Sequence, residues 1–472
     1  MHRLSAALWA SSLILVACGP PVEDNPPPAP TGGETEEPTP SEVVIRVNNG
    51  PREGETQRQE EWDLKIALFE ERHPGIRVEV TDWEYDPQGF AARSLSGDLE
   101  TVINTWATEG FRTIEEGLAQ DLTDLLETWE HGGELDPQIL APYTRDGRVY
   151  AMPIYAYSMA LFFDRRIFTE QGIVDESGEP RPPATWEEFL ETAQRLTDSS
   201  TGRCGYLLVG EVPLGGWHSL NWGWQAGGEY ERLGDDGLWH AAFASEEIAT
   251  AFRFLQSLRW EHGVMPPSIS IRQREAWQMF AAGQVGMMLD AASEHIFNTL
   301  RDEYDYDVTN LFVAPLPAGP GGRAHQVGAD YLIVTPGATE QQRQAAFQWM
   351  IWHHDPEWLE AKWSLWRAQG RAVGYPAVPV LHGPLGDLQA ELVERNRTYP
   401  RFPAYEEGIV GTLHTEPPVA CQALYREVLS PTLQTVLGSP DEDPLPLLER
   451  LAESFERDHI APFNAQLTAS TE

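Results

Sequence analysis

The stretch from residue 43 to residue 80, VVIRVNNGPREGETQRQEEWDLKIALFEERHPGIRVEV, decides the fold. It begins with a run of β-branched residues, Val43 to Val47, that is typical of a buried strand. Apolar residues then recur at helical spacing between Trp62 and Phe69, and His-Pro-Gly at 73–75 ends that helix. Alternation from Ile76 to Val80 predicts a second strand. A strand, a helix and a strand in this order predict a parallel sheet with a helical crossover.

The rest of the chain continues this alternation of strands and helices. We expect a third strand at 98–105 and a helix at 111–126. The nearly uncharged stretch Tyr150–Phe163 is long enough to cross from one sheet to another. Later, 311–316 and 328–334 predict a hairpin that leads into a long helix, and the last part of the chain is mainly helical. Further elements are expected as helices at 186–196, 246–262 and 274–282 and a buried strand at 285–290.

Size and charge limit what the chain can be. The 430 residues after position 42 exceed the usual limit of a single core, so we expect at least two lobes. The formal net charge of −40 argues against a nucleic-acid partner and against anionic lipid surfaces. No metal-ligand spacing, phosphate loop or other cofactor motif occurs in the sequence, so we expect no cofactor and no metal site.

The first 42 residues predict export. A basic start and an apolar run to Ala17 are typical of a signal peptide, residues 1–17. Leu15-Val16-Ala17-Cys18-Gly19 resembles a bacterial lipobox, which predicts lipidation of Cys18; a plain signal peptide cleaved nearby is the alternative. Residues 18–42 form a proline-rich, acidic linker that we expect to be disordered. Gly19 leaves open whether the anchor lies in an inner, an outer or a single membrane.

Cysteines and tryptophans provide two more signals. Cys204 and Cys421 could form a disulfide in an exported protein, or stay two isolated thiols. Trp217, Trp222 and Trp224 lie among glycines, which favours a loop at a binding site. A second group of tryptophans, between 349 and 366, has helical spacing and is typical of a core face.

The chain also resembles a known family over residues 43–465. The segments that carry the resemblance are His73-Pro74-Gly75-Ile76-Arg77-Val78-Glu79-Val80, Ser96-Gly97-Asp98, Tyr150-Ala151-Met152-Pro153, Phe162-Phe163-Asp164-Arg165-Arg166-Ile167-Phe168, Pro183-Ala184-Thr185-Trp186-Glu187-Glu188-Phe189, Phe280-Ala281-Ala282-Gly283-Gln284-Val285-Gly286-Met287-Met288 and Ala314-Pro315-Leu316-Pro317 followed by Gly328. Their order and spacing resemble the family 1 extracellular solute-binding proteins, the carbohydrate-uptake receptors of ABC importers.

This resemblance implies an α/β, two-lobe periplasmic-binding-protein-like fold with a hinge. Three crossing segments would lie near residues 154, 310 and 366. The N-terminal lobe would comprise 43–153 plus 310–365, and the C-terminal lobe 154–309 plus 366–465. In this fold a ligand is enclosed between the lobes, which close about the hinge.

The resemblance also implies a set of ligand-binding residues in the cleft. Aromatic rings would stack on a sugar, and carboxylates would accept its hydroxyl groups. Asp330 follows Gly328, where family members often carry further glycines, and this departure leaves its role open. The expected residues are Arg52, Glu53, Trp106, Glu109, Tyr157, Trp217, His218, Trp222, Asp290 and Asp330.

The expected function is a monomeric receptor that binds a sugar or oligosaccharide and delivers it to ABC permease subunits without catalysis. A receptor for a polyamine or another cation is the alternative, since an acidic cleft with aromatic rings would also serve it. A glycoside-processing enzyme is a third reading, because Asp290 with Glu109 or Asp330 could supply a carboxylate pair.

Overall fold

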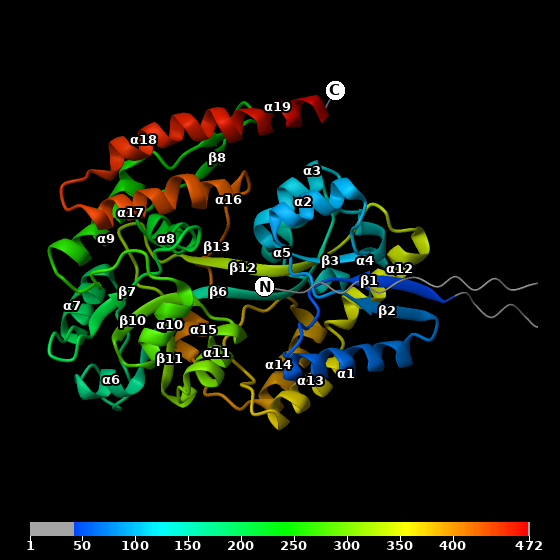
Figure 1. Ribbon diagram of the computed structural model, residues 1–472, viewed down its shortest axis with the longest axis horizontal. Helices are drawn as coiled ribbons and strands as arrows, with labels where there is room; N and C mark the ends of the chain where they lie inside the picture. The colour runs from blue at the N-terminus through cyan, green and yellow to red at the C-terminus, as the bar shows by residue number, and fades with distance from the viewer. Residues whose placement is uncertain (1–41, 471–472) are drawn as a thin grey trace, which may run out of the picture. The chain divides into compact units, whose positions relative to one another are not determined.

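The computed structural model describes residues 42–470 (Figure 1). The signal peptide, Cys18 and most of the linker lie outside the described residues. The strands are β1 Val43–Val47, β2 Ile76–Val80, β3 Val102–Trp106, β4 Thr144–Arg145, β5 Arg148–Val149, β6 Met152–Asp164, β7 Cys204–Leu207, β8 Glu231–Leu233, β9 Trp239–Ala241, β10 Val285–Ala291, β11 Leu311–Ala314, β12 His325–Val334 and β13 Leu413–Thr415.

The helices are α1 Thr56–Arg72, α2 Pro87–Ser96, α3 Gly110–Glu115, α4 Thr123–Thr128, α5 Pro137–Leu140, α6 Arg165–Glu170, α7 Trp186–Leu196, α8 Leu214–Gln225, α9 Glu246–Trp260, α10 Gln273–Ala281, α11 Glu294–Tyr304, α12 Glu340–Trp352, α13 Pro356–Ala368, α14 Gly383–Asn396, α15 Pro403–Gly408, α16 Cys421–Ala423, α17 Ser430–Gly438, α18 Pro444–Phe455 and α19 Ala461–Ser470. Within residues 42–470, none of these helices has the length and apolar composition that a bilayer span requires.

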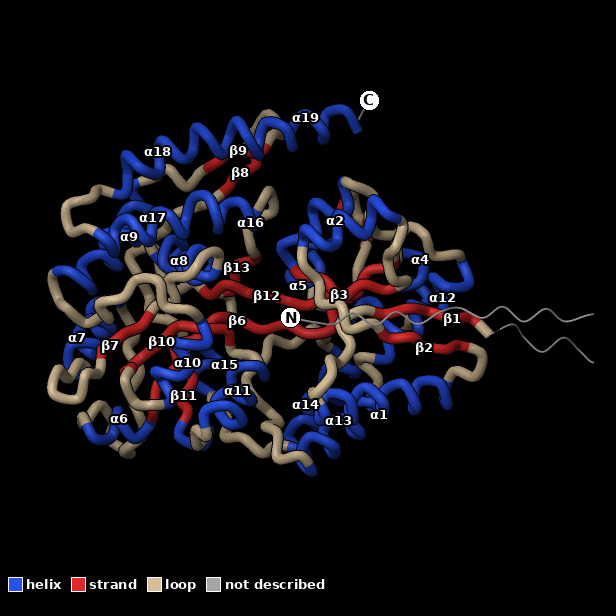
Figure 2. The backbone as a smooth tube through the Cα atoms, viewed as in Figure 1, coloured by secondary structure: helices blue, strands red, loops and turns tan. Residues whose placement is uncertain are grey.

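A central sheet connects the two parts of the fold. Its strands lie in the order β2-β1-β3-β12-β6-β10-β7, with β11 added to β6 and β13 to β12. The opening unit β1-α1-β2 is parallel in the register Val43 to Ile76, which confirms the predicted crossover. Figure 2 shows the strands as a continuous band with helices on both sides. We call the elements packed around β1–β3 the first lobe and those around β7, β10 and β11 the second lobe.

Two long strands pass from one lobe to the other. The first part of β6 pairs with β12, and its second part pairs with β10 and β11. β12 pairs with β3 in the first lobe through residues 330–334 and with β13 through residues 325–327. The stretch Tyr150–Phe163 therefore crosses between lobes, as its apolar sequence predicts.

The structure corrects several other predictions. The crossing expected near residue 310 is made by β12 instead, because β11 pairs with β6 inside the second lobe. The two strands consequently form no hairpin with each other. The helix expected at 111–126 is divided into α3 and α4 at Gly117, which has a left-handed φ of 63°.

The crossing expected near residue 366 also lies elsewhere. Trp366 belongs to α13, and its indole nitrogen donates to Glu61 on α1 in the first lobe at 2.9 Å. Helix α14 packs on α13, and the backbone bridge from Leu381 to Leu135 keeps this segment on the first lobe. α15 packs on β11 of the second lobe, so the chain returns there only after residue 396.

Each lobe has a core that the aromatic residues dominate. Trp349 and Trp352 pack against Phe69, and Trp358 belongs to the same core, as predicted for this tryptophan group. Trp349, Trp358 and Trp363 also line a cavity, so the group is a core face only in part. In the second lobe, Trp222 lies among Trp186, Phe189, Tyr206 and Phe254.

The two cysteines are both free thiols. The Cys204 sulfur approaches the carbonyl of Gln284 at 3.5 Å, whereas Cys421 is buried beside Tyr425 in the core of the second lobe. Of the two alternatives for this pair, the structure has the two isolated thiols and not the disulfide.

Candidate functional site

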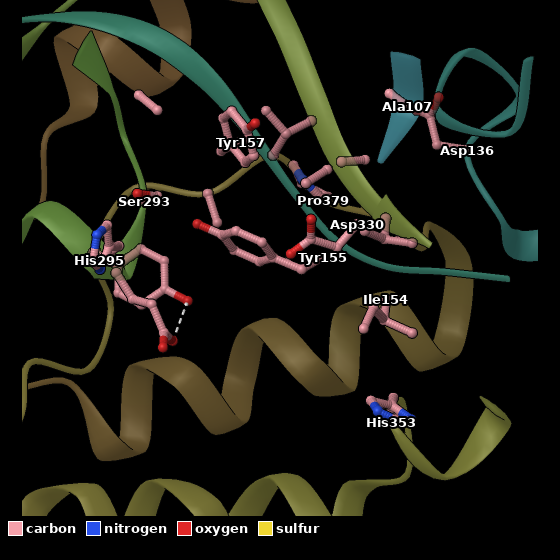
Figure 3. A pocket seen from close by; sticks show the side chains of 18 of the residues that line it. Ala107, Asp136, Ile154, Tyr155, Tyr157, Ser293, His295, Asp330, His353 and Pro379 are labelled. Atoms are coloured by element: carbon pink, nitrogen blue, oxygen red, sulfur yellow. Dashed lines mark hydrogen bonds between the residues drawn. The ribbon is translucent and has the colours of Figure 1, made fainter. Parts of the chain in front are cut away.

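A cavity of about 1570 Å³ lies over the strands that the two lobes share. Its walls come from the ends of β1 and β3, from β6 and β12, and from α8, α11, α14 and residues 374–383. Figure 3 shows its central part, where Tyr155, Tyr157 and Asp330 lie along β6 and β12. Because these strands belong to both lobes, the cavity is built at the junction of the lobes.

Strand register places three side chains of the cavity in one row. Trp106 on β3 is the partner of Asp330 on β12, and Asp330 is in turn the partner of Tyr155 on β6. Directly opposed residues of antiparallel strands project from the same face of a sheet. The backbone therefore fixes a carboxylate between an indole and a phenol, and all three line the cavity.

An irregularity in the sheet adjoins this row. The register between β12 and β6 shifts between Asp330 and Tyr331, because Tyr331 pairs with Pro153 and Ile154 is left over. A bulge of this kind re-aims the neighbouring side chains and is common beside binding sites. Ile154 lines the lower part of the cavity, and Tyr155 lines its centre.

Tyr157 lies over a glycine of the neighbouring strand. Its register partner is Gly328, and a Cβ built on that glycine would be 2.6 Å from the end of the tyrosine ring. The Trp217 ring approaches Tyr157 with centroids 6.4 Å apart and an interplanar angle of 66°. Gly328 thus provides the space in which Tyr157 lies.

Within the part of the chain that the structure describes, the Asp330 carboxylate has no protein partner. Among residues 42–470 it accepts no hydrogen bond and forms no ion pair. Burial, together with the negative charge of Glu294, raises its pKa to about 7. With a pKa near neutral pH, this carboxyl group is partly protonated and partly ionised at pH 7.

A second carboxylate, Glu416, is held by neutral donors. Its Oε1 atom accepts hydrogen bonds from the indole of Trp217 at 2.7 Å, the amide of Gln326 at 2.7 Å and the hydroxyl of Tyr425 at 2.9 Å. Burial raises the pKa of Glu416 to about 7, and the three donors oppose this rise. With every one of these bonds on Oε1, the other oxygen is available to a ligand in the cavity.

A third carboxylate, Glu294, belongs to an ion network between the lobes. It accepts a hydrogen bond from Tyr375 at 3.4 Å and pairs with Arg371 at 3.4 Å. Arg371 also pairs with Glu61 on α1 at 2.7 Å. Burial raises the pKa of Glu294, while Lys362 and Arg371 lower it.

Aromatic contacts join the lobes beside the cavity. Phe111 on α3 packs against Phe463 on α19 with centroids 4.9 Å apart, and against Trp239 on β9 at 6.3 Å. The amide of Gln422 donates to the hydroxyl of Thr108 at 3.3 Å. These contacts link the first lobe to the second without involving the row on the sheet.

Four of the ten predicted residues line this cavity: Trp106, Tyr157, Trp217 and Asp330. Arg52 and Glu53 instead border a separate, shallow depression at the start of α1. There the guanidinium of Arg52 pairs with Glu84 at 2.8 Å. Arg52 and Glu53 therefore lie outside the cavity, whereas Asn48 and Asn49 of the same loop line it.

The other four predicted residues, Glu109, His218, Trp222 and Asp290, are buried behind the cavity wall. Glu109 pairs with Arg112 at 2.7 Å and accepts from Tyr85 at 3.1 Å. Asp290 accepts from Trp277 at 2.6 Å. Trp222 is 1% exposed in the core, and burial lowers the pKa of His218 to about 3. None of the four is among the residues that line the cavity.

Sequence reasoning missed Tyr155, Glu294, Tyr375 and Glu416. A signal for Tyr155 existed, because it lies two residues before Tyr157 and therefore shares its face of the strand. Glu416 follows the short strand β13 and is brought to the cavity by pairing with β12, which no local pattern reveals. Glu294 and Tyr375 meet only through tertiary contact between α11 and residues 371–375.

The fold and the cavity together define a two-lobe binding protein, and comparisons with known proteins agree. A family model for bacterial extracellular solute-binding proteins matches residues 53–358. The chain belongs to this family. A binding protein of Brucella abortus is 27% identical over 277 residues, which cover 56% of this chain and 62% of that protein. The mannitol-binding protein of Pseudomonas aeruginosa is 25% identical over 265 residues, 52% of this chain and 56% of that protein. The matches thus span less than two thirds of these relatives.

Solved structures share the fold. A substrate-binding protein of Listeria monocytogenes, in complex with cycloalternan, has a TM-score of 0.68 and 16% identity, covering 89% of this chain and 99% of that one. UgpB of Mycobacterium tuberculosis, in complex with glycerophosphocholine, has a TM-score of 0.68 and 18% identity, covering 92% of this chain and 100% of that one. These likenesses support the two-lobe α/β architecture.

Proposed function

We propose that this protein is the receptor of an ABC importer and binds a sugar or an oligosaccharide between its lobes. The row of Trp106, Asp330 and Tyr155 at the floor of the cavity carries the proposal. Aromatic faces suit the apolar C–H faces of sugar rings, and carboxylates accept hydroxyl hydrogen bonds more strongly than neutral groups do. The mannitol and cycloalternan named for related proteins support this class of ligand.

The size of the cavity supports a ligand with more than one sugar unit. Its volume of about 1570 Å³ exceeds the roughly 300–1,000 Å³ that is usual for small-molecule sites. Beyond Ile154 the cavity continues to His353 (Figure 3). It is also lined by Lys65, whose ammonium lies 4.6 Å from the Trp349 ring. An extended ligand could therefore contact both the central row and this far end.

The proposed mechanism needs no chemical step. A ligand that contacts both lobes stabilises the closed arrangement, and the closed surface is what a permease would recognise. The chain belongs to a family of binding proteins, and we propose no glycoside-processing activity for it.

A thermal-shift panel of neutral sugars, oligosaccharides and polyamines tests the proposal, followed by calorimetry on every compound that shifts the melting temperature. A ligand at 100 times its Kd stabilises the folded state by about 2.7 kcal/mol. We expect at least one carbohydrate to do so, and Trp106→Ala to weaken its binding. If polyamines stabilise the protein and no carbohydrate does, the carbohydrate function is wrong.

A receptor for a polyamine or another cation is the second candidate. Asp330 favours it, because this carboxylate has no partner among residues 42–470 and has two aromatic cross-strand neighbours, and an ammonium group is attracted both to a carboxylate and to ring faces. The same panel decides between the candidates.

We further propose that the protein is exported, cleaved before Cys18 and anchored by lipid on that residue, and that it is a monomer. The lipobox-like sequence before Cys18 supports the anchor. Cys18→Ser should release the protein from the membrane fraction and abolish labelling by radioactive palmitate. Light scattering of the soluble variant measures its oligomeric state.

A further inference from the structure

We propose that the cleft selects carbohydrates that carry a protonated amino group, and that Trp106, Asp330 and Tyr155 form the subsite for the ammonium. The inference rests on the proposed carbohydrate function and specifies its substrate class. It follows from how the carboxylates of the cavity are paired, from the rings around Asp330 and from the neutral groups nearby.

The carboxylates that line the cavity differ in their partners. Glu61 is paired with Arg371 at 2.7 Å, and Asp136 contacts His382 at 2.6 Å. Glu416 has three neutral donors on one oxygen. Asp330, at the centre of the sheet, has neither a cation nor a hydrogen-bond donor among residues 42–470. Asp330 is half-buried, and closure of the cleft over it without a partner for its charge would be unfavourable; a cationic ligand group would remove that penalty.

The surroundings of Asp330 favour a cation over a neutral hydroxyl. Trp106 and Tyr155 are its two cross-strand neighbours, and both line the same cavity. Ring faces attract ammonium groups. Glu294 adds further negative potential at Asp330, as the rise in the pKa of Asp330 shows. A neutral hydroxyl group would be stabilised little by this negative potential. An ammonium group would be attracted by both carboxylates.

The rest of the cavity favours a sugar as the carrier of the amine. The side chains of Asn49, Asn104 and Gln273 line the same cavity and offer neutral donors and acceptors that suit hydroxyl groups. Asn49 donates to Asn104 at 3.3 Å, which orients both amides. A polyamine has no hydroxyl groups with which to use them.

The test uses sugars that differ only at one substituent. Glucosamine, N-acetylglucosamine and glucose form one triad, their β-1,4-linked trimers form a second, and galactosamine, N-acetylgalactosamine and galactose form a third. Binding is measured by calorimetry at pH 7.5 with the wild type, Asp330→Asn and Asp387→Asn. Asp387 is an exposed carboxylate at the same cavity, so its variant controls for the loss of one negative charge.

We expect the amino sugar of at least one triad to bind the wild type about tenfold or more tightly than its neutral counterpart. The preference should be lost in Asp330→Asn and kept in Asp387→Asn, and N-acetylation should abolish it. Equal or tighter binding of the neutral sugars would overturn the inference and leave the carbohydrate function intact. A preference unchanged in Asp330→Asn, or binding of none of the triads, would also overturn it. The broader panel then decides the carbohydrate function independently.

Discussion

At the scale of single residues, Asp330 makes the stability of the folded protein depend on pH. Its folded-state pKa is raised from 3.8 to about 7 by burial and by Glu294. The folded protein therefore holds this proton more tightly than the unfolded chain does. The resulting stabilisation is fully present below pH 3.8 and is lost as the pH rises through 7. Above pH 7 the ionised, unpaired carboxylate destabilises the folded state.

We therefore expect Asp330→Asn to stabilise the ligand-free protein at pH 8, by about 1–3 kcal/mol in the free energy of unfolding. The gain should shrink toward pH 5, where the wild-type carboxyl is already protonated. Urea denaturation of both proteins at the two pH values measures this difference. A variant that is less stable than the wild type at pH 8 would mean that Asp330 has a partner in the folded protein.

The two thiols make a second residue-scale prediction. Burial raises the pKa of the Cys204 thiol to about 12 and that of Cys421 well above its usual range. Because the thiolate is the reactive form, both should be inert toward Ellman's reagent in the native protein. Unfolding in guanidinium without a reductant should expose two thiols per chain in a Cys18→Ser background. Titration of none after unfolding would instead indicate a disulfide.

At the scale of elements, Gly328 on β12 controls the position of Tyr157 on β6. A methyl group at residue 328 would meet the end of the Tyr157 ring, which can rotate away without moving the backbone. We expect Gly328→Ala to fold normally but to weaken ligand affinity by about tenfold, the loss of roughly 1.4 kcal/mol of ring contact. Calorimetry measures the affinity, and circular dichroism verifies the fold.

Gly337→Ala is the matched control, because nothing lies within 4 Å of a Cβ at that exposed position just after β12. It should leave the affinity unchanged. Equal affinities of the Gly328 and Gly337 variants would show that Tyr157 makes no contribution to binding.

Sequence reasoning succeeds for elements whose pattern is local. The unit β1-α1-β2 and the long strand β6 follow from periodicity, because burial on one face of a helix or on both faces of a strand leaves a direct trace in the sequence. Sequence reasoning fails where a strand pairs with another strand that is distant in the sequence. Nothing near residue 311 indicates that β11 adds to β6 rather than to β12, and a tryptophan such as Trp222 is compatible with either a core or a cleft.

The candidate site shows the same division. Trp106 ends β3, and Trp217 lies in the glycine-rich segment, which folds as helix α8 rather than as the predicted loop. Tyr157 and Asp330 lie within the long strands β6 and β12, and all four residues line the cavity. Asp290 also ends a strand, but α10 covers it, since Trp277 of that helix donates to its carboxylate. Burial by a distant helix leaves no mark on the sequence around the residue that it covers.

At the scale of the whole molecule, the aromatic contact of Phe111 with Phe463 and Trp239 should favour the closed arrangement. Phe111 lies outside the residues that line the cavity. Phe111→Ala removes one aromatic pair, worth about 0.5–1.5 kcal/mol. We expect it to weaken ligand affinity by about 2- to 10-fold through the lost closure energy, mainly by faster dissociation.

Stopped-flow kinetics and small-angle X-ray scattering, with and without ligand, measure this effect. Leu95→Ala on α2 of the same lobe is the control, because that side chain is 91% exposed. If the Phe111 and Leu95 variants dissociate at the same rate, the contact plays no part in closure.

The bulge at Ile154 has a mechanical consequence for how such a receptor signals occupancy. β6 and β12 pair with each other through the junction of the lobes. A movement of one lobe relative to the other must therefore twist this strand pair. The strand pair should twist most easily where its ladder of hydrogen bonds is interrupted, which is between Tyr155 and Pro153. The point that twists most easily thus adjoins the row of Trp106, Asp330 and Tyr155, which we propose to bind the ligand. A ligand bound to this row would make the strand pair harder to twist. Binding of the ligand and loss of lobe movement would then occur together.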